Sequence, residues 1–279
     1  MLISEKSELP NFINIGVAKC GTTSLYRYLG EHPEIYMSPL KETNYFAYDQ
    51  EKSKTDSRSF PIKSLEQYKE LFKPGTDYKV RGDVSPYYFG CPQSAKRIHQ
   101  LIPDIKLAVS LRNPVDRAFS GYQMHVRMGK EKRTIHDAFN EASPFVNVSF
   151  YYSKLRRYFD LFPKEHIHVI VFDDFTRDVI GTTQDLYRFL GVDHKFVPNT
   201  SKTYNKGSLP KSTAVNTLFR HGRRIFQPVT PAPVRKLAAQ LYERNLQPAP
   251  EMPFEIRKRL IDLYHDDIMK VQDLIQYDL

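Results

Sequence analysis

The stretch from Asn14 to Leu25, NIGVAKCGTTSL, has the glycine spacing of a phosphate-binding loop but not its lysine. The usual loop is Gly-x-x-x-x-Gly-Lys-Ser/Thr, and here Gly16 and Gly21 hold the two glycine positions. Thr22 stands where that loop has its lysine, and Lys19 lies three residues before this position. In a kinase the lysine spans the β- and γ-phosphates. A lysine midway along the loop could instead arch over one phosphate and the group bonded to it.

The residues around this loop favour an anion site. A short strand rich in β-branched residues is expected over Phe12–Val17, and a helix is expected over Thr22–Leu29. Free backbone N–H groups and the helix dipole attract an anion at a helix N-terminus, and three hydroxyl side chains occupy the first turn here. The alternative is a glycine turn in which Lys19 is merely exposed.

A second candidate anion site follows the apolar run Ile105–Leu111, which is the strongest strand signal in the chain. Arg112 comes directly after this run, where open α/β sheets bind their ligands. Ser120 lies eight residues later, about two turns along the helix expected over Asn113–His125. A guanidinium and a hydroxyl can together clamp a phosphate. Arg112 alone could equally form a structural salt bridge.

Strand and helix patterns alternate through the first half of the chain. This alternation predicts an α/β fold with a central parallel sheet flanked by helices. Besides the elements named above, strands are expected over Glu34–Pro39, Lys79–Ser85 and Ile167–Asp174, and a helix over Cys91–Leu101.

The character of the sequence changes in its last third. Asn199–Ser212 is polar and is expected to form a loop, and Gln227–Pro233 is rich in proline. Apolar residues recur at helical spacing after Pro253 and predict a C-terminal helix. We expect a single P-loop-like domain over residues 1–279, with a core over about 11–212 and a helical C-terminal extension over about 213–279.

The charge balance and the cysteine content indicate which partners and which cellular compartment to expect. The chain has 41 Lys+Arg against 32 Asp+Glu, and the net charge of +9 favours anionic partners. Cys20 and Cys91 form no disulfide framework or zinc motif, so a reducing compartment is expected. No run of about 18 apolar residues and no signal-peptide pattern occur. We therefore expect a cytoplasmic protein without a transmembrane segment, although a chain trimmed of an anchor would look the same.

The two anion motifs together resemble those of sulfotransferases that use 3′-phosphoadenosine 5′-phosphosulfate (PAPS). Lys19–Ser24 is similar to their 5′-phosphosulfate loop, and Arg112–Ser120 is similar to their 3′-phosphate motif. The resemblance covers about residues 11–212 and is closest to the carbohydrate (heparan-type) and bacterial enzymes. Further similar segments are Pro39–Phe46, Phe150–Phe175 and Thr203–Pro210.

The resemblance implies in-line transfer of a sulfuryl group from PAPS, with adenosine 3′,5′-bisphosphate (PAP) as product and no metal required. Lys19 would stabilise the leaving phosphate, and Glu42 would be the general base. From the residues alone, Glu42 could instead be a surface glutamate paired with Lys41, and Tyr151 could replace Tyr152 at the adenine. The implied nucleotide-binding residues are Lys19, Cys20, Gly21, Thr22, Thr23, Ser24, Arg112, Ser120, Tyr152, Lys206 and Gly207.

The acceptor side is less defined. Asp83 could orient the substrate or Lys19, or could cap a strand end. Val84 stands where heparan-type enzymes often carry a lysine, so one cation near the sulfuryl group is missing. His99 and His125 are weaker candidate bases. The aromatic residues that could line an acceptor cleft are Tyr45, Phe46 and Tyr87.

Several acceptors and two other functions fit parts of the sequence. The acceptor could be a hydroxyl or amine of a glycan, a glycolipid or a small metabolite, and no nucleic-acid partner is expected. Arg220–Phe226 could be a substrate lid or a peripheral membrane contact. The chain could alternatively be a P-loop nucleotide kinase, which magnesium-dependent turnover of ATP would indicate. It could also be a non-catalytic protein that binds a nucleotide or polyanion, with salt-sensitive binding and no turnover.

Overall fold

The computed structural model describes residues 8–51, 59–140, 143–201, 208–212, 245–248 and 251–277. Within it the chain forms two compact units, each assembled from separate stretches. Unit 1 comprises Met1–Pro114, Phe150–Tyr204 and His265–Leu279, and unit 2 comprises Val115–Ser149 and Asn205–Tyr264. The expected single domain with an extension from about residue 213 stays a prediction.

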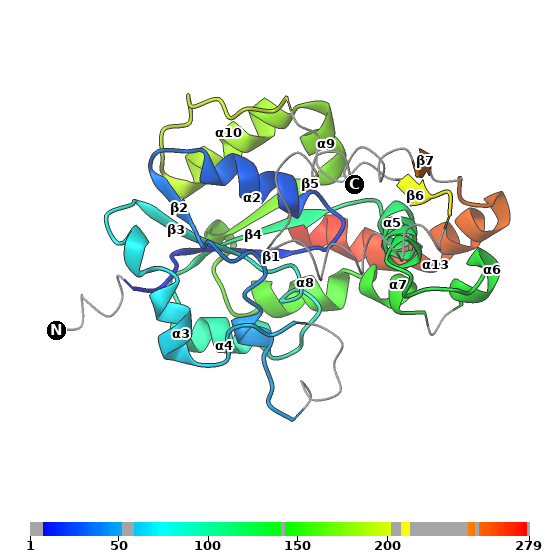
Figure 1. Cartoon of the computed structure of the whole chain (residues 1–279), viewed down its shortest axis with the longest axis horizontal. Helices are drawn as coiled ribbons and strands as arrows, with labels where there is room; N and C mark the ends of the chain where they lie inside the picture. The colour runs from blue at the N-terminus through cyan, green and yellow to red at the C-terminus, as the bar shows by residue number, and fades with distance from the viewer. Residues whose placement is uncertain are drawn as a thin grey trace. The chain divides into compact units, whose positions relative to one another are not determined.

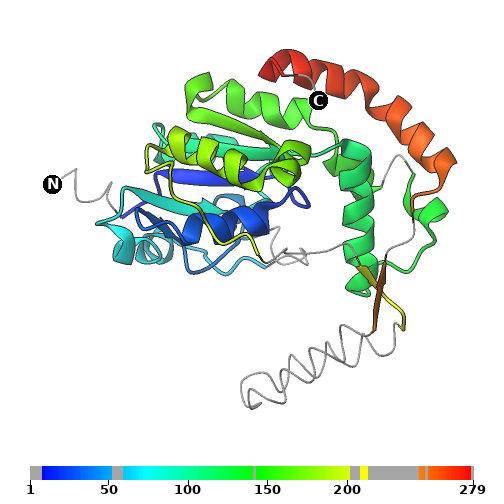
Figure 2. The ribbon, with the colours of Figure 1, turned by 90° about the horizontal axis from the view of Figure 1, so that it is seen from above.

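Unit 1 is built on a five-stranded sheet with the order β2-β3-β1-β4-β5 (Figure 1). Every neighbouring pair is parallel, and Figure 2 shows the strands from the perpendicular direction. The predicted parallel α/β sheet is therefore confirmed. The strands are β1 (Phe12–Gly16), β2 (Ile35–Met37), β3 (Val80–Val84), β4 (Lys106–Leu111) and β5 (Ile167–Val171).

Helices cover both faces of this sheet, as a parallel sheet requires. On one face, leucines of α2 and α10 pack with Phe12, Ala108 and Ile170 of the strands. Figure 1 shows α3, α4 and α8 on the opposite side. The helices of unit 1 include α2 (Thr22–Gly30), α3 (Leu65–Glu70), α4 (Ser94–Leu101), α8 (Tyr152–Phe159), α9 (Phe172–Arg177) and α10 (Val179–Leu190). Single turns of 3₁₀ helix lie at Tyr45–Ala47, Lys73–Gly75 and Lys164–His166.

Two local expectations were wrong. The strand predicted through Asp174 ends at Val171, because Phe172 begins α9 and two aspartates in its first turn favour a helix N-terminus. The loop predicted over Asn199–Ser212 contains β6 (Ser208–Pro210), which pairs antiparallel with β7 (Leu246–Pro248). The partner strand is distant in the sequence, so no local pattern marks β6.

Unit 2 holds α5 (Pro114–Arg127), α6 (Ile135–Ala138), α7 (Pro144–Val148) and the start of α13 (Phe254–Ile275). The first residue of α5, Pro114, is the last residue of a stretch of unit 1. The predicted C-terminal helix is confirmed as α13. Arg117 is buried and donates to Ser149 Oγ and to the Phe145 carbonyl, each at 2.7 Å. In the part of the chain that the structure describes, no helix is long and apolar enough to cross a bilayer.

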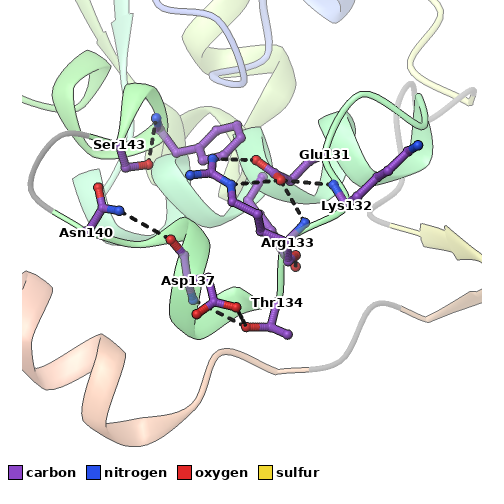
Figure 3. A network of polar contacts seen from close by, with 9 residues as sticks. Glu131, Lys132, Arg133, Thr134, Asp137, Asn140 and Ser143 are labelled. Atoms are coloured by element: carbon purple, nitrogen blue, oxygen red, sulfur yellow. Dashed lines mark hydrogen bonds and ion pairs between the residues drawn. The ribbon is translucent and has the colours of Figure 1, made fainter.

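The turn between α5 and α6 is held by Glu131 (Figure 3). Its carboxylate accepts from Arg133 Nη2 at 2.7 Å and Nε at 3.1 Å, and from the backbone N–H groups of Lys132 and Arg133 at 2.9 Å. Thr134 then caps α6 by accepting from the Asp137 N–H. The bonds from Arg133 are the largest cause that holds the pKa of Glu131 at about 2.

Replacement of Glu131 should therefore lower the stability of the protein at neutral pH. A carboxyl with a depressed folded pKa stabilises above its unfolded pKa of 4.5 and loses this contribution as pH falls toward about 2. We expect Glu131→Gln to cost about 1 kcal/mol at neutral pH, because solvent around the exposed Arg133 side chain weakens the ion pair. Urea unfolding measured at several pH values should show a flatter dependence below pH 4.5 for the variant.

Glu165→Gln is the matched control, because Glu165 is an exposed glutamate of unit 1. It should leave the stability at neutral pH unchanged. Equal losses in the two variants would contradict the role of the Glu131 turn.

Candidate functional site

The candidate site lies at the carboxyl edge of the unit 1 sheet, where β1, β3 and β4 end side by side. Val17 N–H donates to the Ser110 carbonyl at 3.0 Å, and Ser85 N–H donates to the Asn14 carbonyl at 3.1 Å. The residues that follow these three strands therefore start from one edge, where open α/β sheets bind ligands. This edge brings the predicted loop at Lys19 together with Arg112, Asp83 and the segment that carries Glu42.

The two glycines of the loop are both required by its geometry. Gly16 has φ 139°, and a side chain there would place its Cβ 2.8 Å from the Pro86 carbonyl oxygen. Gly21 has φ 80°, and its Cβ would lie 2.9 Å from the ring of Phe175. Lys19, between them, also has a positive φ of 78°. The loop is therefore shaped by close contact with the segments after β3 and β5.

The start of α2 provides the anion-binding groups. Gly21 is the N-cap residue and supplies no side-chain cap to the first turn. Thr22 is buried, whereas Thr23 and Ser24 are half-buried. Backbone N–H groups of a first turn have no partner inside the helix, and a phosphate or sulfate can satisfy them. The predicted residues from Gly21 to Ser24 thus lie together at one helix N-terminus.

Arg112 is held beside this loop. Its Nη1 donates to the Lys19 carbonyl at 3.4 Å, and its guanidinium carbon lies 4.7 Å from the centre of the Phe172 ring. Its own carbonyl accepts from the Tyr151 hydroxyl at 2.9 Å. A guanidinium over an aromatic face is favourable and keeps its N–H donors in one plane. The structure therefore places a fixed positive charge next to the loop.

The structure distinguishes the two tyrosines that could contact adenine. Tyr151 is fully buried and anchors the backbone of Arg112. Tyr152 is half-buried and begins α8, where its backbone N–H donates to the Asp267 carboxylate at 3.2 Å. Lys270 Nζ lies 6.0 Å from the Tyr152 ring centre. These positions favour Tyr152 over Tyr151 as a ligand contact.

For three of the predicted nucleotide-binding residues, the described part of the chain shows no position at this edge. Ser120 lies on α5 in unit 2, so its approach to Arg112 stays a prediction. Lys206 and Gly207 lie outside the described residues, as does the segment Arg220–Phe226.

Glu42 lies in the segment after β2. Its backbone N–H donates to the Val84 carbonyl at 3.0 Å, and its φ of 65° is left-handed. Its side chain is 54% exposed, and Oε1 lies 2.7 Å from Lys41 Nζ. An exposed pair of this kind contributes little stability. The pairing with Lys41 is thus present, and it leaves the Glu42 carboxylate accessible.

Asp83 lies near the end of β3 and is fully buried. Its Oδ2 accepts from the hydroxyls of Thr43 at 2.9 Å, Tyr68 at 3.0 Å and Tyr88 at 3.0 Å, and its Oδ1 accepts from Ser85 at 2.9 Å. Burial raises the pKa of Asp83, while the four donors oppose the rise. The carboxylate thus faces inward, and the predicted contact with substrate or Lys19 stays a prediction.

The predicted acceptor aromatics divide by burial. Phe46 is 2% exposed, and its ring contacts the edges of Tyr68 and Tyr88. Tyr45 is half-buried and stacks on Tyr68, with ring centres 4.5 Å apart. Tyr87 is also half-buried. Tyr45 and Tyr87 therefore have exposed surface for an acceptor, whereas Phe46 is part of the core.

The sequence reasoning missed the side chains that support the site. Phe172 and Phe175 contact Arg112 and Gly21, and their spacing by three directly after a strand could have indicated a helix face. Tyr68 carries no local signal, because its contacts with Asp83 and Tyr45 come only from folding. Among the described residues, no group of three or more His, Cys, Asp or Glu is placed to hold a metal ion.

A side chain at Gly21 should distort the loop. We expect Gly21→Ala to lower stability by about 1–2 kcal/mol, because the new Cβ meets Phe175 and needs a left-handed backbone. Binding of an anion at the start of α2 should weaken with it. Thermal unfolding and titration with PAP would measure the two effects.

Gly90→Ala is the control for this substitution. Among the described residues, nothing beyond its chain neighbours lies within 4 Å of the position that a Cβ would take at Gly90. Its stability and its affinity for PAP should therefore match those of the unmodified protein. A loss similar to that of Gly21→Ala would contradict this account of the loop.

Comparison with known proteins identifies relatives of the chain. The sulfotransferase family model matches residues 10–195. The membrane-associated sulfotransferase kil1 of Dictyostelium discoideum is 33% identical over 129 residues, 45% of this chain and 25% of that protein. Heparan sulfate glucosamine 3-O-sulfotransferase 5 of Mus musculus is 25% identical over 197 residues, 66% of this chain and 54% of that protein. The chain thus spans between a quarter and about half of the length of these curated relatives.

Solved structures agree with this assignment. A sulfotransferase from Alicyclobacillus acidocaldarius matches with a TM-score of 0.73 and 28% identity, covering 97% of each chain. The sulfotransferase domain from the curacin biosynthetic pathway shares the fold, with a TM-score of 0.52 and 13% identity over 97% of this chain and 99% of that chain. The predicted resemblance to heparan-type and bacterial sulfotransferases is confirmed. The chain belongs to the sulfotransferase family.

Proposed function

We propose that this chain transfers a sulfuryl group from PAPS to a hydroxyl or amine of a glycan. Membership of the sulfotransferase family supports sulfuryl transfer in general. The observation that carries the donor assignment is the loop at the start of α2 with Arg112 held beside it. A glycolipid or a small metabolite is the alternative acceptor.

The loop at the start of α2 would bind the sulfated 5′-phosphate of PAPS rather than a nucleoside triphosphate. The N–H groups and hydroxyls at the start of α2 would bind the 5′-phosphate, and Lys19 would neutralise the oxygen that leaves with it. Arg112 would bind the 3′-phosphate, and Ser120, Lys206 and Gly207 stay phosphate contacts implied by the family resemblance alone. Cys20 would form part of the loop around this phosphate, although its side chain is buried and its backbone N–H donates to the Val17 carbonyl at 3.2 Å. Tyr152 would contact the adenine.

The reaction is a displacement at sulfur, for which PAPS supplies the sulfuryl group and PAP is the leaving group. The acceptor oxygen or nitrogen forms a bond to sulfur as the bond from sulfur to the phosphate oxygen breaks. Glu42 takes the acceptor proton, and Lys19 balances the charge that develops on the leaving phosphate. The exposed carboxylate of Glu42 fits this role, because an acceptor can reach it.

A glycan acceptor is supported by charge and by the relatives. Heparan sulfate glucosamine 3-O-sulfotransferase 5 acts, by its name, on heparan sulfate. The net charge of +9 would attract an acidic glycan, and the half-buried rings of Tyr45 and Tyr87 could contact sugar rings. Val84 replaces a lysine common in heparan-type enzymes, so a different sulfation position or a less acidic glycan is proposed.

Calorimetric titration with PAP tests the donor site directly. We expect the protein to bind PAP without magnesium, and Lys19→Ala and Arg112→Ala to weaken binding by about 10- to 100-fold, because each removes a charged contact with phosphate. The controls are Lys195→Ala and Arg188→Ala, which remove the same charges from exposed positions at the opposite edge of the sheet, where Asp193 N–H contacts Glu34. Equal weakening by the controls would indicate a bulk charge effect, and tighter binding of magnesium-ATP would favour the kinase alternative.

Replacement of the proposed base tests the chemistry. We expect Glu42→Gln to lower transfer from radiolabelled PAPS to a panel of glycans, glycolipids and small phenols and amines by about 100-fold, since general base catalysis contributes that much. Affinity for PAP should stay the same. Glu70→Gln is the control, because Glu70 also pairs with a neighbouring lysine, Lys73, on the surface. Binding of PAP without transfer to any acceptor by the unmodified protein would instead favour a non-catalytic function.

A further inference from the structure

We propose that Asp83 is a positioning residue for Glu42, and that it acts through buried hydroxyl groups that fix the backbone of residues 43–46. This inference rests on the proposed role of Glu42 as the base. It adds a residue that acts on the reaction without touching substrate.

The first link is a direct hydrogen bond. Thr43 Oγ1 donates to Asp83 Oδ2 at 2.9 Å, and both residues are 0% exposed. Thr43 directly follows Glu42, so this bond fixes the peptide on the carboxyl side of Glu42. On the amino side, the Glu42 N–H donates to the carbonyl of Val84, the residue after Asp83. One strand end therefore holds Glu42 from both sides.

The next links pass through hydroxyls. Ser85 Oγ donates to Asp83 Oδ1 at 2.9 Å and accepts from the Asn44 N–H at 3.3 Å. Tyr88 Oη donates to Asp83 Oδ2 at 3.0 Å and accepts from the Phe46 N–H at 3.4 Å. A hydroxyl has one hydrogen, and an ionised carboxylate can only accept. The carboxylate therefore draws the hydroxyl hydrogens toward itself and leaves the oxygen lone pairs for the backbone N–H groups.

The conformation of this segment needs such support. Glu42 and Asn44 have φ values of 65° and 52°, in the left-handed region that residues with side chains rarely adopt. A backbone of this kind persists only where surrounding contacts determine it. Three of the four hydroxyls that contact Asp83 hold this segment: Thr43 Oγ1 belongs to it and donates to Asp83, and the hydroxyls of Ser85 and Tyr88 accept its backbone N–H groups.

The fourth hydroxyl reaches the segment by its ring. Tyr68 donates to Asp83 Oδ2 at 3.0 Å, and its ring stacks on Tyr45. Burial, followed by the nearby charge of Asp83, raises the pKa of Tyr68 well above its usual value, so the hydroxyl keeps its hydrogen and donates. Asp83 thus orders the four side chains that connect it to the segment from Glu42 to Phe46.

The test compares Asp83→Asn with the unmodified protein by amide hydrogen exchange, PAP titration and transfer kinetics. The amide group keeps the size of the carboxylate but replaces one acceptor by a donor, so at least one hydroxyl must turn away. We expect exchange at Asn44, at Phe46 or at both to become about tenfold faster, since a hydroxyl released by residue 83 no longer keeps its lone pair directed at the backbone N–H. Affinity for PAP and KM for PAPS should stay within about twofold, whereas kcat should fall at least about tenfold as the base is misplaced.

Two tyrosine variants separate positioning from general stability and remain available where Asp83→Asn does not fold. Tyr68→Phe removes one donor to Asp83, whereas Tyr187→Phe removes a buried hydroxyl that donates to the Tyr28 carbonyl elsewhere in unit 1. We expect Tyr68→Phe to lower kcat by about three- to tenfold, and Tyr187→Phe to leave it unchanged at a temperature where all variants are folded.

Three outcomes would overturn the proposal. They are unchanged exchange at Asn44 and Phe46 in the folded variants, faster exchange spread evenly over the strands of the sheet, and equal losses of kcat in Tyr68→Phe and Tyr187→Phe. The exchange measurement needs no donor or acceptor. A protein that fails to bind PAP would therefore contradict the proposed function, while the exchange result would still decide whether Asp83 holds this segment.

Discussion

The parallel pairing of β1 with both β3 and β4 is the constraint on which the rest of unit 1 depends. Because the three strands run in the same direction, the chain leaves all of them at one edge of the sheet. Gly16 lies so close to the Pro86 carbonyl that no side chain fits between them. The shape of the anion loop and the path of the chain after β3 are therefore set together. Arg112, directly after β4, adds its charge at the same place.

The buried carboxylate of Asp83 supports the segment that carries Glu42 at this edge of the sheet. Taking a carboxylate out of water is costly unless hydrogen bonds replace its hydration. Asp83 meets four hydroxyl donors, and two of the same hydroxyl oxygens accept backbone N–H groups of the segment after Glu42. The free energy that offsets burial of Asp83 thus also orders an otherwise unfavourable backbone. The exposed Glu42 side chain depends on this buried layer.

The two sides of the edge use different chemistry. Backbone N–H groups, hydroxyls and fixed cations gather at the start of α2 and at Arg112, as an anionic donor would require. Aromatic rings and an exposed carboxylate characterise the segments after β2 and β3. In a sulfuryl transfer the first group would hold the leaving nucleotide, and the second would receive the acceptor.

The sequence by itself determined the family, the parallel α/β sheet, and the two anion motifs, because each depends on a short local pattern. The glycines of the loop, the apolar run before Arg112 and the glutamate before an aromatic pair are all visible within a few residues. Strand positions followed from the same local signals, although the sequence extended the last strand past Val171 into α9.

Only the tertiary structure decided which side chains meet. It assigned Tyr151 to the core and left Tyr152 partly exposed, a difference that two adjacent tyrosines do not show in sequence. It turned Asp83 inward, because Thr43 and Tyr68, which are distant in the sequence, join the nearby Ser85 and Tyr88 around one carboxylate. It also paired β6 with a distant β7. Long-range packing sets these contacts, and a local sequence pattern carries no record of them.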